Sequence, residues 1–164
     1  LAEDTRQANQ LAVFDRGSVV VVAQQEAPGY WGISIRVGSH ISLYDTGSGH
    51  VLLAFRSQEE RLMMINEYSA SGEETTMETE FFERLDQIRE RGYEIMPSAQ
   101  TAGVFNLSAP VLGPDGRALA ALTVPYINLV NAAQAPDMAE TQRMLTKTSR
   151  QLSKLAGADF EIPT

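Results

Sequence analysis

Two stretches in the second half of the chain alternate between apolar and polar residues, with a turn sequence between them. They span residues 104–112 and 117–126, are rich in strand-favouring residues, and are separated by Gly113-Pro114-Asp115-Gly116. Proline fixes φ and glycine can adopt positive φ, so this tetrapeptide favours a tight connection between antiparallel strands. The pattern therefore predicts a β-hairpin.

The turn also predicts which residues face each other across the hairpin. If Leu112 pairs with Arg117, then Asn106 lies opposite Thr123, so two polar side chains meet within apolar strands. Alternation with period two gives the first strand one face with Val104, Asn106 and Ser108 and another with Phe105, Leu107, Ala109 and Val111. The polar face is either a solvated sheet surface or the floor of a pocket, and the pattern leaves both interpretations open.

Shorter β-rich runs predict four more strands. Residues 10–14 and 18–24 flank Asp15-Arg16-Gly17, which is typical of a second hairpin. Residues 31–37 alternate in the manner of a half-buried strand, and residues 93–96 form another short run.

Capping residues predict where the helices begin and end. Ser57 with Glu60 forms a capping box that opens a helix through about residue 68, and Thr75 with Glu78 forms another. The second helix ends in a basic turn at Gly92, a residue suited to the left-handed helix stop.

Two other segments have helical character. Asp137 and Glu140 cap a closing helix that ends at residues 154–157, and its apolar positions are Met144, Leu145, Thr148, Leu152 and Leu155. Residues 1–9 are consistent with the end of a helix, whereas residues 51–55 suit a buried helix or a strand. The order of elements predicts an α+β fold, with a mainly antiparallel central sheet flanked by helices.

Composition narrows the class of protein. With 164 residues and 43% hydrophobic content, the chain is predicted to form one domain with an adequate core. It has no cysteine and no run of 18 apolar residues, so we expect a cytoplasmic protein with no membrane partner. The net charge of −8 disfavours binding to the phosphate backbone of a nucleic acid unless a local basic patch overrides it. No such patch is visible in the sequence.

One tetrapeptide matches an enzyme signature. Asp45-Thr46-Gly47-Ser48 matches the signature sequence of the aspartic peptidases. Their chemistry needs two carboxylates that share a proton, and the chain has only one copy of this signature. Gly47-Ser48-Gly49 can instead open a helix whose first amides bind a carboxylate or phosphate, or Thr46 or Asp45 simply caps that helix. His40 and His50 lack cysteine or a carboxylate cluster at metal spacing, so we predict neither a metal site nor a cofactor.

Several short blocks, taken in order, resemble the effector-binding domain of the IclR family of bacterial transcriptional regulators. They are residues 46–55, 88–93, 103–104, 108–111, and Gly116 followed by residues 120–124. The resemblance covers nearly the whole chain. It implies a GAF-like domain over residues 1–164, a small organic effector, and a homo-oligomer, dimer or tetramer. The first residue is Leu1, and the family's winged-helix DNA-binding domain is expected to precede this chain.

The resemblance also implies a set of effector-binding residues. The helix start would contribute Gly47 and Ser48, and Tyr30 and Ile33 would form an apolar wall. The remaining candidates come from the hairpin and the strand before it, and they are Met96, Asn106, Ser108, Thr123 and Pro125. The resemblance implies no catalytic residue and no particular effector.

Three hypotheses follow from the sequence. The first is the ligand-sensing domain of a regulator, which binds a carboxylate-bearing effector and couples it to oligomer arrangement and DNA binding. The second is a hydrolase that uses Asp45 or Ser48. The third is an assembly module without a ligand.

Overall fold

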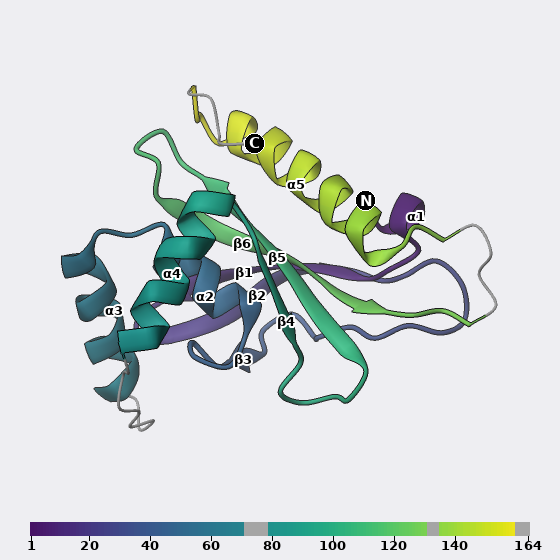
Figure 1. The fold of residues 1–164 in the computed structure, drawn as a ribbon, viewed down its shortest axis with the longest axis horizontal. Coiled ribbons are helices and arrows are strands. Elements are labelled where there is room, and N and C mark those ends of the chain that lie inside the picture. Colours follow the sequence, from purple (N-terminus) through teal and green to yellow (C-terminus); the bar gives the residue numbers. More distant parts are fainter. Residues whose placement is uncertain (71–78, 131–134, 160–164) are drawn as a thin grey trace.

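The computed structural model describes residues 1–70, 79–130 and 135–159. Its six strands form one sheet in the order β3-β2-β1-β6-β5-β4, and every neighbouring pair is antiparallel (Figure 1). The strands are β1 Asn9–Asp15, β2 Ser18–Gln25, β3 His40–Ile41, β4 Glu94–Pro97, β5 Val104–Leu112 and β6 Ala118–Ile127. The predicted α+β class and antiparallel sheet are confirmed.

Helices cover both faces of this sheet (Figure 1). They are α1 Ala2–Thr5, α2 Gly47–Ala54, α3 Gln58–Ala70, α4 Thr79–Arg91 and α5 Met138–Leu155. On one face, Leu145 of α5 packs against the apolar side of the hairpin formed by β5 and β6. On the other face, α2 packs against β5, β6 and α4. All eight residues of α2 are buried, which explains why the sequence around it has no polar stripe.

The predicted pairing of the hairpin was wrong by two residues. Ser108, not Asn106, lies opposite Thr123, and Asn106 lies opposite Pro125. The turn brings Leu112 opposite Ala118, and a bulge at Leu119 shifts the register by one more residue. Because the total shift is an even number of residues, each side chain keeps its predicted face of the sheet.

Two other predictions of strand and helix extent were also wrong. Residues 31–36 form no strand, and three consecutive residues of this segment, Ile33, Ser34 and Ile35, lie against a cavity described below. Trp31 and Val37, which belong to the predicted inward set, are exposed. Alternation alone does not make a strand, because a strand also needs a hydrogen-bonded neighbour. The first helix ends at Thr5 instead of residue 9, because Arg6 adopts a left-handed conformation with φ of 55°.

The capping residues within the described chain are confirmed. Ser57 and Glu60 exchange hydrogen bonds of 3.2 and 2.9 Å through their side chains and amides, and Asp137 accepts from the amide of Glu140 at 2.8 Å. Gly92 ends α4 with φ of 84°. The predicted capping box of Thr75 and Glu78 falls outside the described residues.

The closing helix differs from its prediction at one end. Leu145 is fully buried as expected, but Leu155 is 85% exposed. The sheet-facing side also carries small hydroxyl residues that the apolar pattern overlooked, namely Thr141, Ser149 and Ser153.

Candidate ligand-binding site

A cavity of about 450 Å³ lies where the start of α2 meets the polar face of the hairpin. Its walls come from residues 33–35, 39–42 and 46–48 and from Ser98, Gln100 and Thr101, and β1 adds Gln10. Its floor includes Val104, Asn106, Thr123 and Pro125. A cavity of this volume is in the range that proteins use for small ligands.

The structure brings together most of the predicted effector-binding residues. Six of the nine line this cavity, namely Ile33, Gly47, Ser48, Asn106, Thr123 and Pro125. Ser108 lies directly behind it, bonded to Thr123. Met96 pairs with Asn106 from β4 but is not among the lining residues, and Tyr30 is fully exposed and lies outside the lining too.

The start of α2 presents backbone donors to the cavity. Thr46 is the N-cap, and its hydroxyl accepts from the amide of Gly49 at 3.0 Å while its carbonyl accepts from the amide of His50 at 3.1 Å. The two remaining first-turn amides belong to Gly47 and Ser48, and both residues line the cavity. These amides carry the positive end of the helix dipole.

A chain of hydroxyl groups joins α2 to the hairpin. The hydroxyl of Thr123 lies 2.9 Å from that of Ser48 and 2.7 Å from that of Ser108. Ser108 is fully buried and Thr123 is 2% exposed. The polar face of the hairpin is therefore covered by α2, which decides against a solvated sheet surface.

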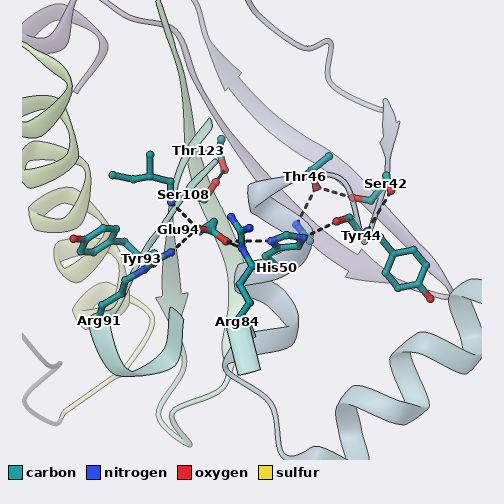
Figure 2. A network of polar contacts seen from close by, with 12 residues as sticks. Ser42, Tyr44, Thr46, His50, Arg84, Arg91, Tyr93, Glu94, Ser108 and Thr123 are labelled. Carbon is teal, nitrogen blue, oxygen red and sulfur yellow. Dashed lines mark hydrogen bonds and ion pairs between the residues drawn. The ribbon is translucent and has the colours of Figure 1, made fainter. Parts of the chain in front are cut away.

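On the same face, next to Ser108 in the sheet, an ionic network around buried Glu94 connects α2 to α4 and β4 (Figure 2). His50 Nδ1 lies 3.1 Å from the carboxylate of Glu94, and His50 Nε2 lies 2.5 Å from the carbonyl oxygen of Tyr44. Both partners are acceptors, so His50 makes both bonds only when each ring nitrogen carries a proton. Glu94 also accepts from Arg84 at 2.7 Å and from Arg91 at 2.5 Å.

The network keeps Glu94 ionised although its side chain is fully buried. Burial raises the pKa of this carboxyl group, but the hydrogen bonds from His50 and Arg84 and the charges of Arg84 and Arg91 outweigh that effect and lower the pKa to about 2. Sequence reasoning considered His50 only as a metal ligand and missed Glu94. The one available signal was a lone acid at the start of an otherwise apolar short strand.

The geometry around Asp45 and Ser48 does not support a hydrolase. Asp45 is exposed and precedes a helix, and its side chain accepts from the hydroxyl of Ser42 at 3.2 Å. The hydroxyl of Ser48 contacts Thr123, while His50 is directed to Glu94 and Tyr44. Within the described residues, no group of three or more His, Cys, Asp and Glu side chains could hold a metal ion.

An antiparallel sheet with a long helix on one face, and a cavity under a helix start on the other, defines a GAF-like regulatory domain. The family description "Bacterial transcriptional regulator IclR C-terminal" matches residues 1–154, and the chain belongs to this family. The predicted family and the GAF-like fold class are confirmed.

Individual relatives agree with this assignment. The chain is 29% identical over 160 residues to the HTH-type transcriptional regulator KdgR of Escherichia coli, across 96% of this chain. The crystal structure of the C-terminal domain of E. coli KdgR superposes with a TM-score of 0.71 at 27% identity, covering 93% of this chain and 89% of that one. Both comparisons are with a transcriptional regulator.

A second solved structure shares the fold and holds a ligand. It is a double mutant of the inducer-binding domain of the Acinetobacter transcription factor PobR, in complex with 3-hydroxybenzoic acid. Its TM-score is 0.72 at 24% identity, covering 92% of this chain and 90% of that one.

The chain spans 60% of the length of E. coli KdgR and 48% of the p-hydroxybenzoate hydroxylase transcriptional activator of Acinetobacter baylyi. In the part of the chain that the structure describes, no helix is long and apolar enough to cross a membrane.

Proposed function

We propose that this domain is the sensor of a transcriptional regulator and binds a small organic acid in the cavity beside α2. The observation that carries this proposal is the position of the cavity, between the first-turn amides of a helix and a buried polar strand face. Strands and a helix, whose geometry is fixed by the fold, thus supply the polar groups that a ligand would meet.

The start of α2 suits the carboxylate of such a ligand. The amides of Gly47 and Ser48 are available there, together with the positive end of the helix dipole. The described residues that line the cavity include no lysine or arginine. An anion would therefore be held mainly by directed backbone hydrogen bonds, without a lysine or arginine, and His40 is the one basic side chain among the described lining residues.

The rest of the cavity suits an apolar body with a polar end. Ile33, Ile35 and Pro125 supply apolar surface, and Asn106 supplies a donor and an acceptor. Tyr30 and Met96 were also predicted here, and they would reach a ligand only after a local rearrangement.

A change in the position of α2 on ligand binding would be transmitted to α4 and β4 through the ionic network around Glu94. Ser48 lies on the cavity, and His50 two residues later bonds to Glu94. Glu94 begins β4, and the segment that follows this strand contributes Ser98, Gln100 and Thr101 to another wall of the cavity. We expect this connection to carry the effector signal to the oligomer and to a DNA-binding domain, in the cytoplasm.

The proposal is tested with a thermal-shift screen of small carboxylic acids that includes 3-hydroxybenzoic acid, followed by calorimetry on Asn106→Leu. This substitution keeps the approximate volume but removes a donor and an acceptor. Losing a hydrogen bond to a polar ligand group costs about 1.5 to 3 kcal/mol, so affinity should fall about tenfold to a hundredfold.

Asn66→Leu is the matched control, because Asn66 is exposed on α3 and lies outside the cavity. It should leave affinity unchanged. Equal affinity of a folded Asn106→Leu variant and the parent would place the site elsewhere. Stabilisation by neutral compounds alone would show that the carboxylate is not part of recognition.

A further inference from the structure

A second groove, of about 710 Å³, runs between the junction of α4 and β4 and the outer side of α5. Five cationic side chains line it, namely Arg91, Arg143, Lys147, Arg150 and Lys154. None of the described residues in its lining is acidic. The whole chain has only 13 Lys and Arg against 21 Asp and Glu. The groove therefore gathers basic side chains in a protein whose net charge is negative.

Helix geometry explains why the sequence shows no basic run. Arg143, Lys147, Arg150 and Lys154 recur at intervals of four, three and four residues, which places them on one side of α5. The opposite side, with Leu145, packs on the sheet. Eleven residues of helix rise by roughly 16 Å, so the four cations form an elongated stripe. Arg143, at its start, is paired with Glu140 at 2.5 Å.

The fifth cation comes from a different element and is held in place. Arg91 donates to the carbonyl of Tyr93 at 2.6 Å and to the buried carboxylate of Glu94 at 2.5 Å. Its guanidinium also lies 5.3 Å from the centre of the Tyr93 ring. Arg91 therefore forms a fixed wall opposite the stripe on α5, with its charge shared with the carboxylate of Glu94.

We propose that this groove binds the sugar–phosphate backbone of duplex DNA. Cations spread over about 16 Å exceed what one small acid can neutralise, whereas they match several successive phosphates of one strand. Gln142, Thr146 and Gln151 line the same groove and are side chains that donate to phosphate oxygens.

DNA is favoured over an acidic protein because the chain belongs to a family of transcriptional regulators, which work beside this polyanion. The contact would carry no sequence information and would only add affinity and orientation. It is independent of the proposed effector site, because the groove and the cavity share no lining residue.

Fluorescence anisotropy of a short duplex of arbitrary sequence, titrated with the 164-residue chain at several low salt concentrations, tests the proposal. The double variant Lys147→Glu/Lys154→Glu removes two exposed cations of the stripe. Its matched control, Arg16→Glu/Arg36→Glu, makes the same charge change at exposed residues outside the groove. Thermal unfolding verifies that both variants fold.

The parent chain and the control should bind with a similar dependence on salt. The groove variant should bind about tenfold more weakly or worse, with a slope of log affinity against log salt that is smaller by about 2. Asn106→Leu should retain duplex binding, which separates this proposal from the effector proposal.

Two results would overturn the DNA contact. One is equal loss of binding in the groove variant and the control, which would show a general charge effect. The other is tighter, groove-dependent binding of poly-L-glutamate than of the duplex, which would assign the groove to an acidic protein.

Discussion

Gly47 is required by a close approach between α2 and the hairpin. A Cβ atom at this position would lie 2.5 Å from the hydroxyl oxygen of Ser108 and 3.2 Å from its Cβ. Ser108 is fully buried and bonded to Thr123, so it has little room to move. The absence of a side chain at Gly47 thus allows the helix amides to lie close to the polar floor of the cavity.

Gly47→Ala should therefore disturb both stability and ligand binding. We expect a loss of about 1 to 3 kcal/mol in the free energy of unfolding, because one extra carbon overpacks the contact with Ser108. Urea unfolding measures this loss. Gly113→Ala is the control, because its added Cβ would meet only the half-exposed side chain of Leu119, at 3.2 Å. Equal stabilities of the two variants would contradict the proposed close contact.

At the residue scale, the sequence predicted the polar groups of the cavity better than their partners. Alternation correctly assigned Asn106, Ser108 and Thr123 to one face, since period two survives an even shift in register. It could not find the pairing of His50 with Glu94, which are 44 residues apart and meet only after α2 and β4 have packed. Long-range ionic contacts leave no periodic signal.

At the scale of elements, α5 compensates for the irregularity in the hairpin. The bulge at Leu119 interrupts the ladder beside Leu112, and the amide of Leu112 donates to the hydroxyl of Ser153 at 2.8 Å. Ser153 in turn donates to the carbonyl of Ser149 at 2.8 Å, and Ser149 donates to the carbonyl of Pro110 at 2.5 Å. The sequence predicted the turn but not the bulge, beside which the Leu112 amide bonds to a helix far along the chain.

Ser153→Ala should leave the amide of Leu112 buried without its acceptor. Such a loss costs about 1 to 3 kcal/mol in the free energy of unfolding. Hydrogen exchange gives a more specific measurement, because the Leu112 amide should exchange faster in the variant. Gln151→Ala, at an exposed position of the same helix, should change neither quantity. Unaltered exchange at Leu112 would mean that Ser153 does not protect the bulge.

At the scale of the whole molecule, the fold creates features that composition conceals. The chain has a net charge of −8, but folding gathers five cations into one groove and buries Glu94 among His50, Arg84 and Arg91. The sheet class was predictable from local turns and alternation. The structure of residues 31–37 was not predictable, because residues 33–35 of this segment line a cavity and the segment does not join the sheet.

Glu94 should make the domain sensitive to acid. Its pKa is about 2 in the folded chain against an ordinary value of 4.5, so its stabilising effect is complete above pH 4.5 and is lost as the pH falls toward 2. Glu60 titrates in the same direction, since a hydrogen bond from the backbone of Ser57 lowers its pKa. A variant at Glu94 is therefore needed to separate the two carboxyl groups.

Glu94→Gln should cost roughly 3 kcal/mol or more in the free energy of unfolding near neutral pH, because it leaves buried His50 without its carboxylate. The difference from the parent chain should shrink as the pH falls from 4.5 toward 2, where the parent also loses the charge. Urea unfolding across this pH range measures both effects, with Glu90→Gln as the control at an exposed position of α4. A stability difference that stays constant down to pH 2 would show that the ionised carboxylate is not what holds α2, α4 and β4 together.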